Sequence, residues 1–316
     1  MTRDGSHGAL GLGLALFSAA TFGTAGTFAD SLMAIGWTPG AVVTFRIVIA
    51  ALLLTVPALR ALRGRWDEVR AAARVILAFG FVAVAGCQLF FFNAVKRLDV
   101  GVALLLEYSG ILLVVAFLWV RHGQRPRGLT VIGGVAALAG LVLVLNPTTG
   151  GMDPVGVLWG LLAGTGLATY FVISSRAEDA LPPIALAWAA MVVGAATLIV
   201  LDAVQVLPFH MNTGDVVLFD DHVSWVVPVV GLSLVAAAIA YASGIAATRL
   251  LGARVASFVG LTEVLFAVLI AWVLLGQAPG AVQAIGGVVV LAGIALVRVG
   301  DSAVTAPAAE AELVQA

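Results

Sequence analysis

Two distant stretches of the chain are near copies of each other. Residues 94–144 read AVKRLDVGVALLLEYSGILLVVAFLWVRHGQRPRGLTVIGGVAALAGLVLV, and residues 247–297 read ATRLLGARVASFVGLTEVLFAVLIAWVLLGQAPGAVQAIGGVVVLAGIALV. They align without a gap, and the alignment pairs Trp119 with Trp272 and brings a Gly-Gln pair, a Pro and the motif IGGV into register. Shared apolar composition alone would not match Trp, Gln and Pro. We therefore interpret the pair as an internal duplication.

The composition around the repeat indicates a protein with many membrane spans. Of 316 residues, 62% are hydrophobic and 10% are charged, and the mean hydropathy is +1.12. Soluble domains carry about a quarter charged residues, so this chain has too few charges to cover a globular surface. The apolar runs do not alternate, and they are about twice as long as a barrel strand requires. We therefore expect an all-α polytopic membrane fold, which satisfies the backbone within each helix.

Ten segments are long and apolar enough to cross a bilayer, which takes about 20 residues each. They cover roughly residues 8–28, 38–59, 75–95, 99–120, 128–145, 155–174, 183–202, 224–248, 252–275 and 280–299. Most connections are short, and the exception is 203–223. From residue 301 the sequence is small and polar, and we expect 301–316 to be a disordered cytoplasmic tail.

Lys and Arg are distributed unevenly among the connections. With the N-terminus placed inside, the inside segments hold 13 of the 16 Lys and Arg residues, whereas the outside segments hold only Lys96 and Arg97. Arg46 lies within a span. Because basic residues accumulate in cytoplasmic loops, we expect both termini to be cytoplasmic, in a multi-pass protein of the cell inner (plasma) membrane.

The duplication divides the chain into two halves of five spans, residues 1–150 and 151–300. An odd number of spans turns the second half upside down relative to the first, so the predicted topology is an inverted repeat. Such repeats are characteristic of secondary transporters, which hold the substrate near the midplane between the halves. The expected architecture is therefore ten helices arranged as two inverted five-helix repeats.

Several of these stretches resemble one family of transporters. The second copy, ATRLLGARVASFVGLTEVLFAVLIAWVLLGQAP, resembles the signature of the EamA family in the drug/metabolite transporter (DMT) superfamily: a small residue near the loop, a central Glu and an apolar run ending in LLLGE. The first copy, RLDVGVALLLEYSGILLVVAF, is similar to the threonine/homoserine exporter branch. TFRIVIAALLL at 44–54 resembles the second helix of the family, including its Arg.

The resemblance covers both halves and implies export of small organic metabolites such as amino acids. The chain departs from the family pattern at Gln124 and Gln277, where the family usually has Glu. It also has Val264 where a Pro often follows the central Glu, with Ile111 at the corresponding position of the first half. These departures weaken any transfer of substrate identity.

Glu107 and Glu263 are acidic residues in the middle of apolar spans. In the alignment of the two copies they are three residues apart, so they share a helix face about one turn apart. Counted at 1.5 Å per residue from the predicted ends at Asp99 and Gly252, they lie about 12 Å and about 16 Å deep. Both depths approach the midplane of a core that is about 30 Å thick.

A charge at this depth costs at least about 2.5–3.5 kcal/mol, so neither carboxylate is expected to face lipid. Glu107 must face a polar cavity, pair with a cation or stay protonated. Arg46 has the same predicted depth and is a natural partner. The pair would then be a structural ion pair, or a site for a zwitterion whose carboxylate binds Arg46 and whose ammonium binds Glu107. We predict that Arg46, Glu107 and Glu263 form the substrate or coupling site.

Other polar and aromatic side chains within the spans are candidates for lining the pathway. Gln88 and Tyr241 coincide in the repeat register, and Tyr108 adjoins Glu107. The alternative is that such groups form hydrogen bonds between helices, each worth about 0.6 kcal/mol. The complete set of predicted pathway residues is Gln88, Tyr108, Trp159, Thr165, Thr169, Tyr170 and Tyr241.

The sequence contains no nucleophile motif, P-loop, Rossmann glycine pattern or metalloprotease signature. Cys87 is the only cysteine, which excludes an intramolecular disulfide and a cysteine metal cluster, and its apolar neighbours indicate an inert buried thiol. We therefore expect no enzymatic activity, no cofactor, no resident metal and no nucleic-acid partner.

The predicted function is that of a secondary transporter, an exporter of small metabolites such as amino acids that works by alternating access. Its expected partners are a small-molecule substrate and the lipid bilayer. Proton coupling through Glu107, Glu263 or both stays open, as does a homodimer. The alternatives are a multidrug or nucleotide-sugar carrier and a non-transporting membrane scaffold.

Overall fold

The computed structural model describes residues 2–98, 100–146, 153–175, 181–219, 221–276 and 278–315. Asp99 and Gln277 lie outside the described residues. The elements of the first half of the chain are α1 (Thr2–Gly23), α2 (Ala25–Ala34), α3 (Pro39–Ala61), α4 (Trp66–Ala71), α5 (Ala73–Ala78), the π-helical turn η1 (Phe79–Gly86), α6 (Cys87–Val95), α7 (Val100–Tyr108), α8 (Gly110–His122) and α9 (Gly128–Leu145).

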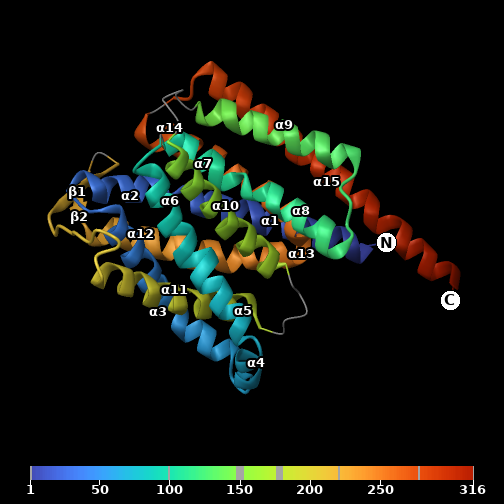
Figure 1. The fold of residues 1–316 in the computed structure, drawn as a ribbon, viewed down its shortest axis with the longest axis horizontal. Coiled ribbons are helices and arrows are strands. Elements are labelled where there is room, and N and C mark those ends of the chain that lie inside the picture. Colours follow the sequence, from blue (N-terminus) through green and yellow to red (C-terminus); the bar gives the residue numbers. More distant parts are fainter. Residues whose placement is uncertain are drawn as a thin grey trace.

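The second half begins with two long helices and then forms a small hairpin before the helices resume. Its elements are α10 (Pro154–Ser174), α11 (Pro183–Ala203), β1 (Asp215–Leu218), β2 (Asp221–Ser224), α12 (Val226–Ser233), the π-helical turn η2 (Leu234–Ile239), α13 (Ala240–Gly260), α14 (Thr262–Leu275) and α15 (Ala281–Gln315). The helices form one bundle (Figure 1). The prediction of an all-α polytopic membrane fold is confirmed.

Within the described residues, nine helices are long and apolar enough to cross a membrane, compared with the ten that we predicted. The difference arises in the predicted ninth span: its first part continues the eighth across Gly252, and its remainder, Thr262–Leu274, is shorter than a full span. The helical stretch Val226–Gly260 has 35 residues, and a straight helix of that length would measure about 52 Å, far more than a bilayer core. Gly252 breaks it with φ +77°, a conformation that glycine adopts readily. The predicted eighth and ninth spans are therefore joined at Gly252 without a loop.

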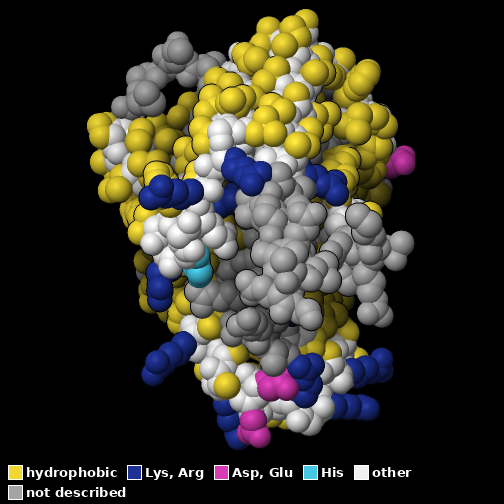
Figure 2. Space-filling model, turned by 90° about the vertical axis from the view of Figure 1, so that its right-hand side faces the viewer, with side chains coloured by type: hydrophobic (Ala, Val, Ile, Leu, Met, Phe, Trp, Pro, Cys, Tyr) yellow, Lys and Arg dark blue, Asp and Glu magenta, His cyan; other side chains and the backbone are white. Residues whose placement is uncertain are grey.

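Both chain termini lie at the same end of the bundle, on the side of α4 (Figure 1). Lys and Arg side chains gather on this end, with hydrophobic side chains above and beside them (Figure 2). The exposed basic residues of the connections on this side are Arg60, Arg63, Arg70, Arg74, Arg121, Arg125 and Arg127. This end of the molecule is the one that the distribution of arginine predicts to be cytoplasmic.

The opposite end is covered by the connection between α11 and α12, the one that the sequence predicted to be long. It contains an antiparallel hairpin in which Asp215 pairs with Ser224. Val216 is buried against α2 and α3, in a cluster with Leu32 and Trp37. The Trp37 indole N–H also donates a hydrogen bond to the carbonyl oxygen of Asn212 at 2.6 Å. The connection is thus fixed to the bundle.

The helices α9 and α15 cross at repeated glycines. A Cβ atom on Gly133 would lie 2.6 Å from the carbonyl oxygen of Gly293, and one on Gly286 would lie 2.8 Å from that of Gly140. Gly133 and Gly286 are equivalent in the repeat, as are Gly140 and Gly293. Such close approach of two backbones is how small residues join membrane helices.

The last helix differs from the prediction for the C-terminal segment. The backbone of α15 is helical through residues 301–315, where we expected a disordered tail. The physical reason lies in the composition of this segment, which is rich in Ala and Glu, residues of high helix propensity.

Candidate functional site

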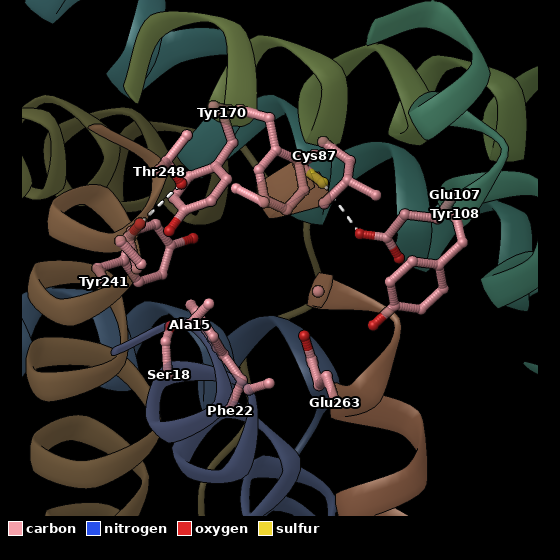
Figure 3. A pocket seen from close by; sticks show the side chains of 18 of the residues that line it. Ala15, Ser18, Phe22, Cys87, Glu107, Tyr108, Tyr170, Tyr241, Thr248 and Glu263 are labelled. Carbon is pink, nitrogen blue, oxygen red and sulfur yellow. Dashed lines mark hydrogen bonds between the residues drawn. The ribbon is translucent and has the colours of Figure 1, made fainter. Parts of the chain in front are cut away.

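A cavity of about 150 Å³ lies in the middle of the bundle (Figure 3). Its walls come from α1, α3, α6 and α7 of the first half of the chain and from α10, α13 and α14 of the second. A buried cavity of about this size is large enough to hold a benzene molecule. The cavity therefore suits a small compact ligand.

The two acidic side chains Glu107 and Glu263 both point into this cavity (Figure 3). Glu107 lies in the last turn of α7, and Glu263 lies in the first turn of α14. Each is two residues from an interruption of its span, at Ser109 and at Leu261. There the backbone tightens: the N–H of Leu112 bonds to the carbonyl of Ser109 at 2.9 Å, three residues back.

The interruption at Leu261 has the same character, since the N–H of Val264 bonds to the carbonyl of Leu261 at 3.2 Å. Tight turns of this kind inside a helix often mark a hinge. Both acidic residues therefore lie beside a local departure from α-helical geometry, one in each half.

The third span of each half carries a second kind of irregularity, a π-helical turn. η1 ends at Gly86 and η2 ends at Ile239, and these residues are equivalent in the repeat. Gln88 follows η1 and Tyr241 follows η2, and both side chains line the cavity. π-Helical turns inside α-helices occur frequently at functional sites. The irregular backbone thus surrounds the cavity in both halves.

Glu107 has a hydrogen-bonding partner that the sequence did not reveal. The Cys87 thiol donates to Oε1 of Glu107 at 3.2 Å (Figure 3) and also lies 3.5 Å from the carbonyl oxygen of Ala163. Cys87 is buried, as predicted. It contacts the acidic residue because α6 packs against α7, and no spacing in the sequence indicates that contact.

The polar neighbour of Glu263 in the cavity is Tyr108, which belongs to the first half of the chain (Figure 3). Tyr108 follows Glu107 directly in the sequence, and its side chain is buried. The end of α7 therefore supplies one acidic group to the cavity and a hydroxyl beside the second acidic group.

Arg46 lines the same cavity but does not form the expected ion pair with Glu107. Among the described residues, Arg46 belongs to no ion pair within 4.0 Å. Its Nη2 donates to the carbonyl oxygen of Ala236 in η2 at 2.5 Å, and its guanidinium lies 5.8 Å from the centroid of the Phe22 ring. Nε is buried and has no hydrogen-bond partner. The guanidinium is thus held by η2 and α1 and keeps an unused donor.

Aromatic side chains form the wall across the cavity from the acidic pair. The rings of Tyr170 and Tyr241 meet edge to face with centroids 5.6 Å apart, and Phe22 contacts Tyr241 at 5.1 Å. Gly244 leaves room for this arrangement, because a Cβ at this position would displace the Tyr170 hydroxyl. Residues of both halves therefore build one continuous aromatic surface.

Three of the predicted pathway residues do not line the cavity. Trp159 stacks on Phe90 with ring centroids 5.7 Å apart. The Thr165 hydroxyl donates to the carbonyl of Leu162 at 2.6 Å, and the Thr169 hydroxyl donates to the carbonyl of Thr165 at 2.7 Å. The two threonines satisfy their hydroxyls within α10 and lie about 140° and about 100° around this helix from Tyr170, whereas Trp159 lies on the face of Tyr170 but about three turns earlier.

The cavity also contains polar residues that sequence reasoning missed. Ser18 donates to the carbonyl of Ala240 at 2.8 Å, and Thr248 donates to the carbonyl of Gly244 at 2.7 Å. Both line the cavity. Ser18 and Thr248 are small, and neither stands out by charge or by repeat position, so no signal in the sequence distinguishes them from other Ser and Thr residues of the spans.

The fold and the cavity define a class of protein: a polytopic helical membrane protein with a polar, acidic pocket enclosed within its bundle. Comparison with known families identifies the class more closely. The model of the EamA-like transporter family matches the chain twice, over residues 9–146 and 154–299. The chain therefore belongs to the EamA-like transporter family.

A curated relative and a solved structure are also similar to this chain. The relative is described as "Uncharacterized transporter YwfM", from Bacillus subtilis (strain 168), and is 33% identical over 175 residues. That alignment covers 53% of this chain and 56% of the relative, so the chain matches a little over half of the relative's length. One crystal structure, described only as "Crystal structure of protein", has a TM-score of 0.75 at 21% identity, over 92% of this chain and 97% of the other. This likeness concerns the fold.

Proposed function

We propose that the protein is a secondary transporter that exports a small metabolite bearing an amino group, such as an amino acid. One observation carries the proposal: Glu107, Glu263 and Arg46 line a single small cavity inside a membrane-spanning bundle. Ionisable residues at this depth are costly and usually serve function. The small size of the cavity favours an amino acid over a nucleotide sugar.

The cavity suggests how such a substrate would be oriented. Its ammonium group would lie between Glu107 and Glu263, which point into the same space (Figure 3). Its carboxylate would accept a hydrogen bond from Arg46, whose Nε has no partner. Charge-assisted hydrogen bonds of this kind are about twice as strong as neutral ones. An apolar side chain would contact Phe22 and the tyrosines.

Transport by alternating access would use the irregular turns as hinges. The interruptions at Ser109 and Leu261 and the turns η1 and η2 adjoin the cavity, so bending there would open it to one side or the other. Because protons and a substrate ammonium would compete for the same two carboxylates, substrate binding would release protons. The resulting exchange would be a proton-coupled antiport.

We infer that the chain lies in the plasma membrane with both termini in the cytoplasm. The support is the accumulation of Arg on the end of the bundle where both termini lie (Figures 1 and 2), since basic residues favour the cytoplasmic side. Under this topology the hairpin β1–β2 faces outward.

The test is transport by purified protein in liposomes, with a panel of amino acids, amines and aromatic cations, with and without a pH gradient. We expect Glu107→Gln to lower amino acid transport by up to about 100-fold, because the loss of a buried charged hydrogen bond costs up to about 3 kcal/mol. Glu68→Gln is the matched control, since Glu68 pairs with Arg65 on α4, away from the cavity.

Wild-type transport that is lost in Glu107→Gln and kept in Glu68→Gln would support the proposal, and dependence on the gradient would add proton coupling. Equal transport by all three proteins would contradict it. Transport of aromatic cations alone would favour the multidrug alternative, and transport of nothing would favour a scaffold.

A further inference from the structure

A second hollow lies between α3 and α11, outside the central cavity. Its volume is about 490 Å³. The helix α3 contributes to both spaces, with Arg46 lining the central cavity and Phe45 lining the hollow. The side chains that line the hollow are Thr44, Phe45, Val48, Ile199, Asp202, Ala203, Gln205 and Phe209.

The hollow contains a carboxylate with no cationic partner. Both oxygen atoms of Asp202 are buried, and the hydroxyl of Thr44 is the polar group beside them. A hydroxyl has a single hydrogen to donate, so it satisfies at most one of the acceptor positions of the carboxylate. Among the described residues, Asp202 forms no ion pair within 4.0 Å. Buried acceptors of this kind are costly unless a donor reaches them.

The position of the hollow indicates where that donor comes from. Asp202 is the penultimate residue of α11, so it lies at one end of a membrane span, near the level of the lipid headgroups. Ile199 on α11 is 49% exposed, and the exposed apolar face of a membrane helix contacts acyl chains. Phe209, in the connection after α11, is 45% exposed. The hollow therefore opens toward lipid, with its carboxylate at the depth of a headgroup.

We propose that this hollow binds the primary ammonium headgroup of a phospholipid of the phosphatidylethanolamine type, with Asp202 as the counter-ion. A primary ammonium carries three N–H donors, which match the two carboxylate oxygens and the hydroxyl oxygen of Thr44. A choline headgroup carries the same charge but no N–H donor, and it would leave these acceptors unsatisfied. The stacked rings of Phe45 and Phe209, with centroids 6.1 Å apart, border the hollow on its apolar side.

The test is native mass spectrometry of delipidated protein, titrated with phosphatidylethanolamine and with phosphatidylcholine of the same acyl chains. We expect wild type to retain the ethanolamine lipid about tenfold or more over the choline lipid, as a charge-assisted hydrogen bond allows. Asp202→Asn should abolish this preference. Thr44→Val, which removes only the hydroxyl, should reduce the preference about threefold. Asp215→Asn, an exposed acidic residue at the same end of the molecule, should leave it unchanged.

Equal retention of the two lipids by wild type would overturn the proposal, as would a preference that survives in Asp202→Asn. If Asp202→Asn fails to fold, the Thr44→Val variant decides, and an unchanged preference there would contradict the site. A further arm adds free ethanolamine. Failure of millimolar ethanolamine to displace the lipid is expected, whereas displacement would assign the hollow to a soluble amine and contradict a lipid ligand.

Discussion

The two halves of the chain share their backbone irregularities and differ in their polar side chains. Each half has a π-helical turn in its third span, ending at equivalent residues, and an interruption in its fourth span next to an acidic residue. Each also contributes a glycine pair to the crossing of α9 and α15. The backbone features that the duplication preserved are the ones that surround the cavity and join the halves.

The side chains at these places have diverged. Cys87 corresponds to Ala240 in the repeat, and Gln88 corresponds to Tyr241. Arg46 lies on the second span of the first half, whereas α11, the second span of the second half, has no basic residue. A symmetric scaffold therefore encloses an asymmetric cavity, with one guanidinium and two differently partnered carboxylates. An asymmetric cavity can hold a zwitterion in one orientation.

The largest expected effect comes from removing the guanidinium of Arg46, which has no basic counterpart on α11. Arg46→Gln should lower transport of an amino acid about 100-fold, because its carboxylate loses a charged partner. Transport of the matching amine, which has no carboxylate, should fall much less. Uptake of the amino acid and of the amine into liposomes, by wild type and by the variant, measures the two losses. If both fall equally, Arg46 holds the fold or the gate and does not recognise a carboxylate.

A second comparison is between two ion pairs at opposite ends of the bundle. Arg254–Asp301 is largely buried, whereas Arg97–Asp153 is exposed. Arg254 bonds to Asp301 at 2.5 Å, with side-chain exposures of 6% and 22%. Asp301→Asn should destabilise the protein by about 3 kcal/mol, since it leaves a buried cation without its counter-charge. Thermal unfolding in detergent measures this effect. A stability loss below about 1 kcal/mol, as for an exposed ion pair, would contradict this prediction. It would show that the carbonyl oxygen of Gln124, which accepts a hydrogen bond from Arg254, is enough to hold the buried guanidinium.

The crossing of α9 and α15 tests whether the halves are equivalent in packing. Gly133→Ala and Gly286→Ala should each destabilise by about 1–3 kcal/mol, because the added methyl group overlaps backbone atoms. The two losses should be similar, as the contacts are repeated. Gly13→Ala is the control, since no atom of another residue lies within 4 Å of the place that its added methyl group would take. Clearly unequal losses would mean that the crossing is not symmetric.

The smallest effect is expected at the exposed ion pair near the opposite end. The side-chain hydrogen bond from Arg97, at 2.9 Å, together with the N–H of Val155, holds the pKa of Asp153 below its ordinary value of 3.8. A lowered folded-state pKa stabilises the fold above the ordinary pKa, and this stability is lost as the pH falls below about 3.8 and through the lower value.

Asp153→Asn should therefore lower the unfolding temperature slightly at pH 7 and by less at pH 3. Melting curves at the two pH values give the comparison. A larger loss at pH 3 than at pH 7 would contradict the sign of this effect.

The sequence predicted the features that depend on periodicity, repetition and charge. Long apolar runs indicated the helical membrane fold. From their depths we predicted that Glu107 and Glu263 form one site with Arg46. In the structure these three residues line one cavity, together with four of the seven predicted pathway residues. Contacts between helices were not predictable. The thiol of Cys87 meets Glu107 only through packing. Thr165 and Thr169 do not line the cavity because of the rotation of α10, and Trp159 does not line it because it lies about three turns from Tyr170 along this helix.

Local backbone geometry was the other part that the sequence did not reveal. Arg46 reaches the carbonyl of Ala236 because η2 lies beside α3, and a π-helical turn has no clear signature in an apolar run. Asp202 lies at the end of a predicted span, but that no cationic side chain of the described residues pairs with it is visible only in three dimensions.

Glu107 and Glu263 are proposed to act on one substrate, and a double-mutant cycle of transport tests this most directly. The rates of wild type, Glu107→Gln, Glu263→Gln and the double variant would be measured in liposomes under one pH gradient. If both carboxylates hold the same ammonium group, the double variant should transport no worse than the weaker single variant, so the losses are far from additive. Additive losses, or full transport by either single variant, would contradict a shared site.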